Sequence, residues 1–252
     1  MSDELHRALA KVPAVTLGFW VIKILATTLG ETGGDAVTMS MGTGYLVGTG
    51  IFMVLFVATV AGQISAQRFH ATLYWLAIIA STTVGTTLAD FCTRSLGIGY
   101  AGGSALLAAC LGGCLLLWYR VMGSVAIGTV SSPQTEAFYW LTIMFSQTLG
   151  TALGDWTADS AGLGYLGGAA IFSALLALVA LALWFTRISR TVLFWSAFVL
   201  TRPLGAVVGD FLDKPVAQGG LELSRYTASA VLVALIVIGI MVLPQRAADK
   251  AH

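Results

Sequence analysis

The chain has 252 residues, of which 57% are hydrophobic and only 10% are charged, and its mean hydropathy is +0.87. Soluble domains carry about 25% charged residues, so this composition excludes a soluble globular protein and predicts a polytopic membrane protein. The net charge of +1 argues against nucleic acid as a partner. The polar N-terminal residues 1–12 lack the apolar region and cleavage site of a removable signal peptide, so none is expected.

Eight apolar stretches follow in chain order, and each is long enough to cross the membrane. A helix needs about 20 apolar residues to cross the hydrocarbon core. The stretches are 14–36, 43–62, 71–91, 99–119, 137–157, 164–185, 192–212 and 227–243. The expected fold is therefore an all-α transmembrane bundle of eight helices.

A fourfold internal repeat organises these stretches into four pairs of helices. Each copy carries a tryptophan, a glycine ten residues later and an aspartate fifteen residues later. These residues are Trp20, Gly30 and Asp35; Trp75, Gly85 and Asp90; Trp140, Gly150 and Asp155; and Trp195, Gly205 and Asp210. The copies cover residues 14–62, 71–119, 137–185 and 192–243 of a single membrane domain, 1–252. The unequal spacing of the tryptophans, with a longer middle connection, indicates that a two-repeat unit was duplicated.

Two spans in each copy make every first helix cross in the same direction, so the four repeats are expected to be parallel about an axis along the membrane normal. Basic residues of the connections divide eight to three between the two sides. One side has Arg7, Lys11, Arg68, Arg120, Arg187, Arg190, Arg246 and Lys250, and the other has Arg94, Lys214 and Arg225. The positive-inside rule then predicts that both termini are cytoplasmic, with the repeat tryptophans at the cytoplasmic interface. The aspartates lie about 22 Å further along each helix, in the outer half of the membrane.

Each first helix carries one polar stripe, because helical residues four apart share a face. The stripes read Asp35, Glu31, Thr27 and Lys23; Asp90, Thr86 and Thr82; Asp155, Thr151 and Gln147; and Asp210, Ala206 and Arg202. Lipid cannot solvate these groups. We therefore expect the four first helices to cluster centrally with their stripes inward, and the second helices to lie outside.

The repeated aspartates are the leading candidates for a functional site, because charges inside a span cost roughly 2.5–3.5 kcal/mol at its centre. The alternative is that they are hydrated helix ends near the outer interface. Glu31 occurs in the first copy alone, and Lys23 and Arg202 are the basic residues deep in spans. We expect Glu31 to pair with one of these two, either as an ion pair that exchanges partners during transport or as simple charge neutralisation.

Two further acids follow the stripes. Asp159 and Asp213 are expected to be solvated charges of the outer loops, where Asp159 would widen an acidic mouth. The repeated glycines are expected to allow close helix packing, although local unwinding that exposes carbonyl groups to an ion is an alternative.

Oxygen ligands dominate this candidate site. Glu31 and the four aspartates, with Thr27, Thr86, Thr151 and Gln147, form the kind of hard site that suits Mg²⁺, Ca²⁺ and Mn²⁺. No histidine lies in a predicted span, which disfavours Zn²⁺, Cu²⁺ and Ni²⁺. A divalent cation is thus the expected substrate, with protons as a second one, and no resident cofactor is expected. Glu31, one turn deeper than Asp35, is the expected coupling residue.

The repeat motifs carry a family resemblance over nearly the whole chain. They are Thr28-Leu29-Gly30-Glu31, Thr83-Val84-Gly85 through Asp90, Thr148-Leu149-Gly150 through Asp155, and Pro203-Leu204-Gly205 through Asp210. In these motifs the chain resembles bacterial membrane proteins built of four copies of a repeat of unknown function. The resemblance implies a bacterial inner-membrane protein and names no substrate. The segment from Glu31 to Asp35 is also similar in style to acidic-glycine motifs of unrelated manganese and calcium exporters, which is an analogy of site chemistry.

Three functions are consistent with these patterns. The favoured hypothesis is a secondary transporter that exports a divalent cation, with Mn²⁺ first. The alternatives are a proton-coupled transporter of a small organic cation, with Trp156 or Tyr100 as contacts, and a membrane scaffold or sensor that transports nothing. No enzyme is expected, since the sequence has no GxSxG or HExxH motif. Self-association into an oligomer stays open.

Overall fold

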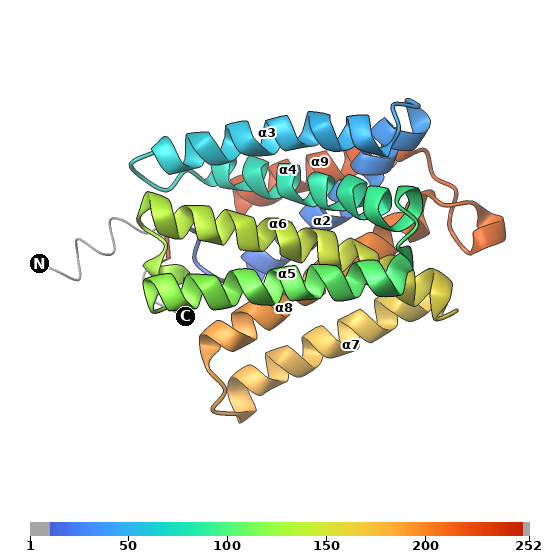
Figure 1. Cartoon of the computed structure of the whole chain (residues 1–252). Coiled ribbons are helices and arrows are strands. Elements are labelled where there is room, and N and C mark those ends of the chain that lie inside the picture. The colour runs from blue at the N-terminus through green and yellow to red at the C-terminus, as the bar shows by residue number, and fades with distance from the viewer. Residues whose placement is uncertain (1–10, 249–252) are drawn as a thin grey trace, which may run out of the picture.

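The computed structural model describes residues 11–248, and in this range it consists of helices and short connections without a strand. Eight α-helices cross the bundle lengthwise (Figure 1). They are α2 (Leu17–Asp35), α3 (Tyr45–Ser65), α4 (Ala71–Asp90), α5 (Gly99–Met122), α6 (Pro133–Asp155), α7 (Gly164–Phe185), α8 (Arg190–Asp213) and α9 (Arg225–Val242). Short π-helical turns continue α2, α4 and α6 as Ala36–Ser40, Phe91–Ser95 and Trp156–Ser160, and short 3₁₀ turns lie at Ile127–Thr129 and Val216–Gln218.

The four first helices of the repeats form a closed ring. α2 packs against α4, α4 against α6, α6 against α8, and α8 returns to α2. We call these four the inner helices. Because the ring closes on itself, the polar stripes of the four repeats face a common axis, as expected from the sequence.

Each second helix packs mainly on the inner helix of the next repeat, not on its own. α3 lies against α4, α5 against α6 and α7 against α8, and α9 completes the cycle by packing on α2. We call these four the outer helices. This exchange ties the first repeat to the last, so the two ends of the described chain are interlocked through α2 and α9.

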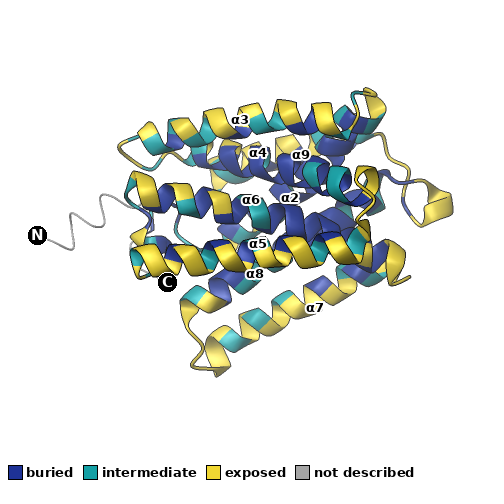
Figure 2. Cartoon of the chain, viewed as in Figure 1, coloured by how far each residue is buried: buried dark blue, intermediate teal, exposed yellow. Residues whose placement is uncertain are grey.

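Burial separates the two sets of helices (Figure 2). In α4, 72% of the most apolar segment is buried, whereas the value for α3 and α7 is 11%. Six of the eight described helices are long and apolar enough to span a membrane, namely α3, α4, α5, α7, α8 and α9. α2 and α6 fall short because they are richer in polar residues, and these residues face the axis. The chain is therefore a multi-pass membrane protein with an apolar outer surface.

One end of the bundle, which we call the aromatic end, is closed by buried rings. Trp75 and Trp140 are 1% and 2% exposed, and the hydroxyl groups of Tyr74 and Tyr139 lie 2.7 Å apart. The indole of Trp195 donates to the carbonyl oxygen of Val125 at 3.0 Å. The prediction that the repeat tryptophans line a lipid interface was wrong for these three, because each is buried against an aromatic ring of the preceding repeat, namely Phe19, Tyr74 and Tyr139 in turn.

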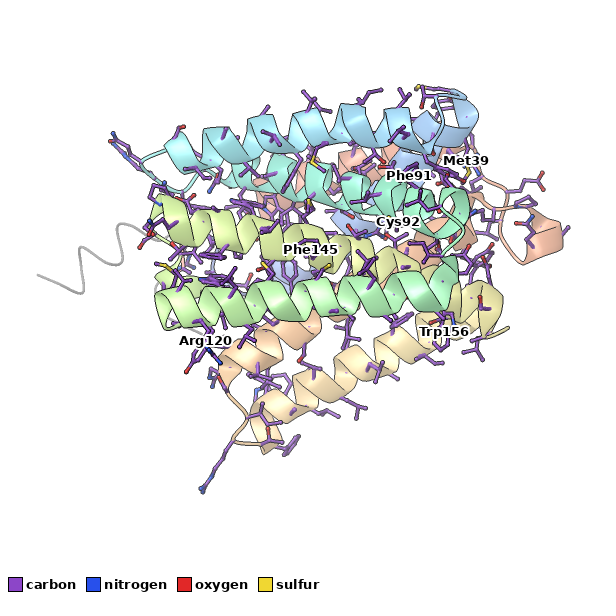
Figure 3. The ribbon with its side chains drawn as sticks, in the orientation of Figure 1. Met39, Phe91, Cys92, Arg120, Phe145 and Trp156 are labelled. Carbon is purple, nitrogen blue, oxygen red and sulfur yellow. The ribbon has the colours of Figure 1, made fainter. Side chains whose placement is uncertain are left out.

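The opposite end, which we call the acidic end, carries the repeat aspartates. Six basic residues lie at the aromatic end, namely Lys11, Arg68, Arg120, Arg187, Arg190 and Arg246, while Arg94, Lys214 and Arg225 lie at the acidic end. Arg120, on one side, and Met39 and Trp156, on the other, mark the two ends in Figure 3. Arg7 and Lys250, which were also counted for the charge rule, lie outside the described residues, as do His6 and His252.

Candidate functional site

The repeated glycines position the inner helices by letting them touch. A Cβ atom on Gly30 would overlap the side chain of Thr82, and one on Gly205 would overlap Thr27. The same relation holds for Gly85 with Gln147 and for Gly150 with Arg202. Each glycine thus contacts one residue of the next repeat, and the last repeat contacts the first. The contacted residue always stands seven places after the tryptophan of its repeat. The inner helices are α-helical through these glycines, so close packing explains the glycines and local unwinding is excluded.

One consequence is a polar layer across the middle of the bundle. It contains one side chain from each inner helix: Thr27, Thr82, Gln147 and Arg202, all fully buried. The Thr27 hydroxyl donates to the backbone at Ile24 and Thr201. By contrast, the Thr82 hydroxyl, both polar atoms of the Gln147 amide and Nε of Arg202 have no partner among residues 11–248.

A buried ion pair lies one turn nearer the acidic end. Nη2 of Arg202 is 3.0 Å from Oε2 of Glu31 and 2.5 Å from the Thr86 hydroxyl. Arg202 is 0% and Glu31 3% exposed, so lipid and water are both kept away from the pair. Of the two basic residues considered as partners of Glu31, the structure thus pairs it with Arg202 and not with Lys23. Thr151, the matching residue of the third repeat, donates to the carbonyl oxygen of Gln147 at 3.4 Å.

Lys23 lies deeper, toward the aromatic end. Its Nζ atom donates to the Thr201 hydroxyl at 3.2 Å and lies 3.8 Å from the centre of the Phe198 ring. Within the described part of the chain, no carboxylate forms an ion pair with it. A cation over an aromatic face gains electrostatic attraction from the ring. Lys23 thus contacts the Phe198 ring instead of the Glu31 carboxylate, which was one of the two expected pairings.

Asp35 and Asp210 are joined by a lysine that follows α8. Nζ of Lys214 is 2.5 Å from Oδ2 of Asp35 and 3.1 Å from Oδ1 of Asp210. Burial lowers the pKa of Lys214, but the carboxylates of Asp210, Asp35 and Asp213 outweigh it and hold this pKa above its ordinary value. The side chain is therefore an ammonium, and we call this arrangement the lysine clamp.

Asp90 and Asp155 are joined in the same way by an arginine. Nε of Arg94 is 2.7 Å from Oδ1 of Asp90, and Nη2 is 3.6 Å from Oδ2 of Asp155. We call this the arginine clamp. Arg94 and Lys214 occupy the same place in the second and fourth repeats, four residues after the aspartate. Each clamp thus links its own aspartate to that of the next repeat, and the two clamps are related by a pseudo-twofold axis.

The two additional acids behave differently from each other. Asp213 is 6% exposed, and its carboxylate is 3.1 Å from Nε of Arg225, whose guanidinium also lies 3.8 Å from Asp35. The expectation of a solvated loop charge was therefore wrong for Asp213, which ends α8 inside the cluster. Asp159 is exposed and accepts a hydrogen bond from the hydroxyl of Tyr100 at 3.3 Å.

The repeat aspartates are buried, at 0–4% exposed, so they are not hydrated helix ends. One set of acids comes close enough to share an ion, because oxygen atoms of Glu31, Asp35 and Asp210 all lie within 4.8 Å of one another. We call these three the acidic triad. Asp90 and Asp155 belong to the arginine clamp instead of the triad.

Charges along the axis nearly cancel. Six carboxylates face five basic side chains, which leaves one negative charge in excess when all are ionised. The acids are Glu31, Asp35, Asp90, Asp155, Asp210 and Asp213, and the bases are Lys23, Arg94, Arg202, Lys214 and Arg225. Because bare charges in hydrocarbon are costly and are normally paired, this balance explains how the bundle holds so many carboxylates.

Comparison with known proteins identifies the class to which this membrane bundle belongs. The family described as Repeat of Unknown Function (DUF347) matches residues 18–69, 73–124, 138–189 and 193–246. The chain belongs to this family, with four copies of the repeat, as the sequence motifs had indicated. Comparisons with curated proteins and with solved structures found no match.

Three residues of the site had been assigned to the outer loops from sequence alone. The charge rule treats Arg94, Lys214 and Arg225 as loop charges that set the orientation. A signal for two of them was present, because Arg94 and Lys214 stand one helical turn after Asp90 and Asp210. That spacing places a base and an acid on one helix face. The same spacing occurs at the same position of the second and the fourth repeats.

Proposed function

We propose that the protein is a secondary transporter of a divalent cation, with Mn²⁺ export favoured, and that the acidic triad binds the cation. The observation that carries this proposal is the triad itself, three buried carboxylates from α2 and α8 within 4.8 Å of one another. Oxygen ligands of this kind suit Mn²⁺, Mg²⁺ and Ca²⁺. The cation is substrate, and no resident cofactor is proposed.

The position of the triad supports transport better than structural metal binding. It lies on the axis of the ring, on the acidic side of the mid-membrane polar layer, and it shares Asp35 and Asp210 with the lysine clamp. Aromatic rings close the axis at one end and ion pairs close it at the other. A buried polar site that is closed on both sides is the arrangement that alternating access requires for an occluded state.

Glu31 is the residue that we propose for coupling. It belongs to both the triad and the pair with Arg202, so a cation that binds Glu31 competes directly with the guanidinium. Loss of that pair would also free the Thr86 hydroxyl, which Arg202 now contacts. The proposal is that Glu31 alternates between Arg202, the cation and a proton.

Transport of an organic cation is less well supported. Trp156, one of the contacts considered for such a substrate, is 42% exposed on the surface of the bundle (Figure 3). The other, Tyr100, is engaged by Asp159 and not by the triad. Neither ring is in contact with the carboxylates that would bind the substrate charge.

Uptake of Mn²⁺ into proteoliposomes tests the transport proposal. We expect Asp35→Asn and Asp210→Asn each to lower the initial rate at least about tenfold, since even groups that only support metal ligands contribute 10–100-fold. Glu31→Gln should remove the pH dependence of transport and retain part of the Mn²⁺ binding. Asp159→Asn, which changes an exposed acid outside the triad, is the matched control and should transport normally. Unaltered rates in the triad variants would contradict transport by this site and favour a scaffold.

We also propose that the membrane is the bacterial inner membrane and that the aromatic end faces the cytoplasm. Basic residues predominate at that end, as the positive-inside rule requires of a cytoplasmic face. Reporter fusions after Arg246 should therefore be active in the cytoplasm, whereas a reporter inserted after Arg94 should be active on the other side. Activity of both reporters on one side would contradict the parallel repeats as well as the orientation.

A further inference from the structure

The two clamps differ in the secondary structure that holds their basic residue. Arg94 lies on the π-helical turn that continues α4, so its position is fixed by a helix that starts at the aromatic end. Lys214 lies beyond the last residue of α8, in extended backbone followed by Pro215. The connection 214–224, which we call the lid, has a short 3₁₀ turn as its sole helical element.

The lid folds back over the end of α8. The amide of Leu221 donates to the carbonyl oxygen of Phe211 at 2.7 Å, and that of Leu223 donates to Leu212 at 2.9 Å. The amide of Glu222 donates to the carbonyl oxygen of Lys214 at 2.9 Å. Gly220 lies directly against this same carbonyl group, where a Cβ atom has no room. The seated lid thus holds Lys214 over the triad.

A second observation shows that Lys214 leaves the triad incompletely satisfied. Its ammonium reaches Oδ2 of Asp35, whereas Oδ1 of the same carboxylate is buried and has no hydrogen-bond partner in residues 11–248. A buried carboxylate oxygen without a partner costs free energy. An ion with more coordination positions than an ammonium would satisfy both oxygens.

We propose that the Lys214 ammonium is an internal cation that occupies the substrate's place, and that the lid withdraws it when a divalent cation binds. This inference rests on the proposed function. Lys214 contacts two of the three triad residues, Asp35 and Asp210, and it is a compact point charge. The guanidinium of Arg94 pairs with the other two aspartates and remains in place.

Electrostatics favours exchange over simultaneous binding. A dication coordinated by Asp35 and Asp210 would lie within a few ångströms of the ammonium, and like charges at that separation in a buried site repel strongly. Replacement of one ammonium by one dication changes the charge of the triad by a single unit. The lid therefore closes the acidic end when the site is empty and supplies the counter-charge that the buried acids need.

Equilibrium binding of Mn²⁺ to the purified full-length chain in lipid nanodiscs tests the inference. If the lid is closed in about 90% of molecules, it lowers the apparent affinity about tenfold, so Lys214→Gln should bind Mn²⁺ about tenfold more tightly than the wild type. Arg94→Gln is the matched control, because it removes one positive charge from the same repeat position in the other clamp. A clearly smaller gain is expected there.

Gly220→Ala provides a second test that keeps every charge and is decisive if Lys214→Gln does not fold. The added methyl group should displace the lid and increase the affinity for Mn²⁺, whereas Gly50→Ala, which has open space around it, should match the wild type. Wild-type affinity in a folded Lys214→Gln or Gly220→Ala protein, or equal gains in Lys214→Gln and Arg94→Gln, overturns the inference and leaves the proposed function intact. No Mn²⁺ binding in any of these proteins overturns both.

Discussion

Replacement of Arg202 by glutamine is expected to lower the free energy of unfolding by roughly 3–5 kcal/mol, the usual cost of removing one partner from a buried ion pair. Arg202 is fully buried and donates to Glu31 and Thr86. Its loss would leave the Glu31 carboxylate unpaired near the middle of the bundle. Denaturant titration in mixed micelles, followed by circular dichroism, measures the change.

A double-mutant cycle separates the ion pair from general damage. Glu31→Gln removes the charge that Arg202 neutralises, so the double variant Glu31→Gln/Arg202→Gln should be markedly more stable than the sum of the single effects predicts. Arg120→Gln is the control, because Arg120 is exposed on α5 at the aromatic end. Additive effects in the cycle would show that the two side chains are energetically independent, contrary to the structure.

Composition and repeat register were sufficient to predict the helices and the inward stripe. Polar side chains recur every fourth residue on α2, α4 and α6, and on α8 with Ala206 between Arg202 and Asp210. In a membrane such a face can be accommodated only in the protein interior. The same argument predicted that all four repeat aspartates would converge, whereas the structure brings Asp35 and Asp210 together in the triad and joins Asp90 and Asp155 through Arg94. Both conclusions depend on the cost of placing polar groups in lipid, and the positions of these groups can be read directly from the sequence.

The packing of the outer helices could not be predicted in this way. α3 is predominantly apolar and 11% of its apolar segment is buried, so its sequence has no continuous polar stripe that identifies a partner. The structure places it on α4 and not on α2. Short connections join α3 to both α2 and α4, so it could pack on either helix. Which of the two it contacts depends on the arrangement of the whole ring.

The clamps were missed for a different physical reason. The positive-inside rule treats basic residues near the ends of spans as solvated loop charges, and Arg94 and Lys214 were counted accordingly. In the structure they neutralise carboxylates that would otherwise be buried without counter-ions. The acids and bases of such a site are best assigned together, because each is stable in the membrane only with the other.

Replacement of Gly85 by alanine is expected to destabilise the bundle by about 1–3 kcal/mol, the usual cost of overpacking. A Cβ atom there would lie 2.8 Å from the backbone carbonyl carbon of Gln147 and 3.0 Å from the amide nitrogen of Thr148. Backbone atoms cannot rotate away as a side chain can, so α4 and α6 must move apart. That movement would separate Asp90 from Asp155 and weaken the arginine clamp.

Two other glycines make this prediction specific. Gly112 on α5 has open space where a Cβ would stand, so Gly112→Ala should be neutral or slightly stabilising through helix propensity. At Gly30 an added Cβ would lie 2.9 Å from the Cβ of Thr82, which is fixed to the backbone of α4, so Gly30→Ala should cost about as much as Gly85→Ala. The same denaturant titration measures all three. A Gly85→Ala protein as stable as Gly112→Ala would mean that the inner helices are not held at contact distance by their glycines. The ring, and with it the convergence of the carboxylates, would then need another explanation.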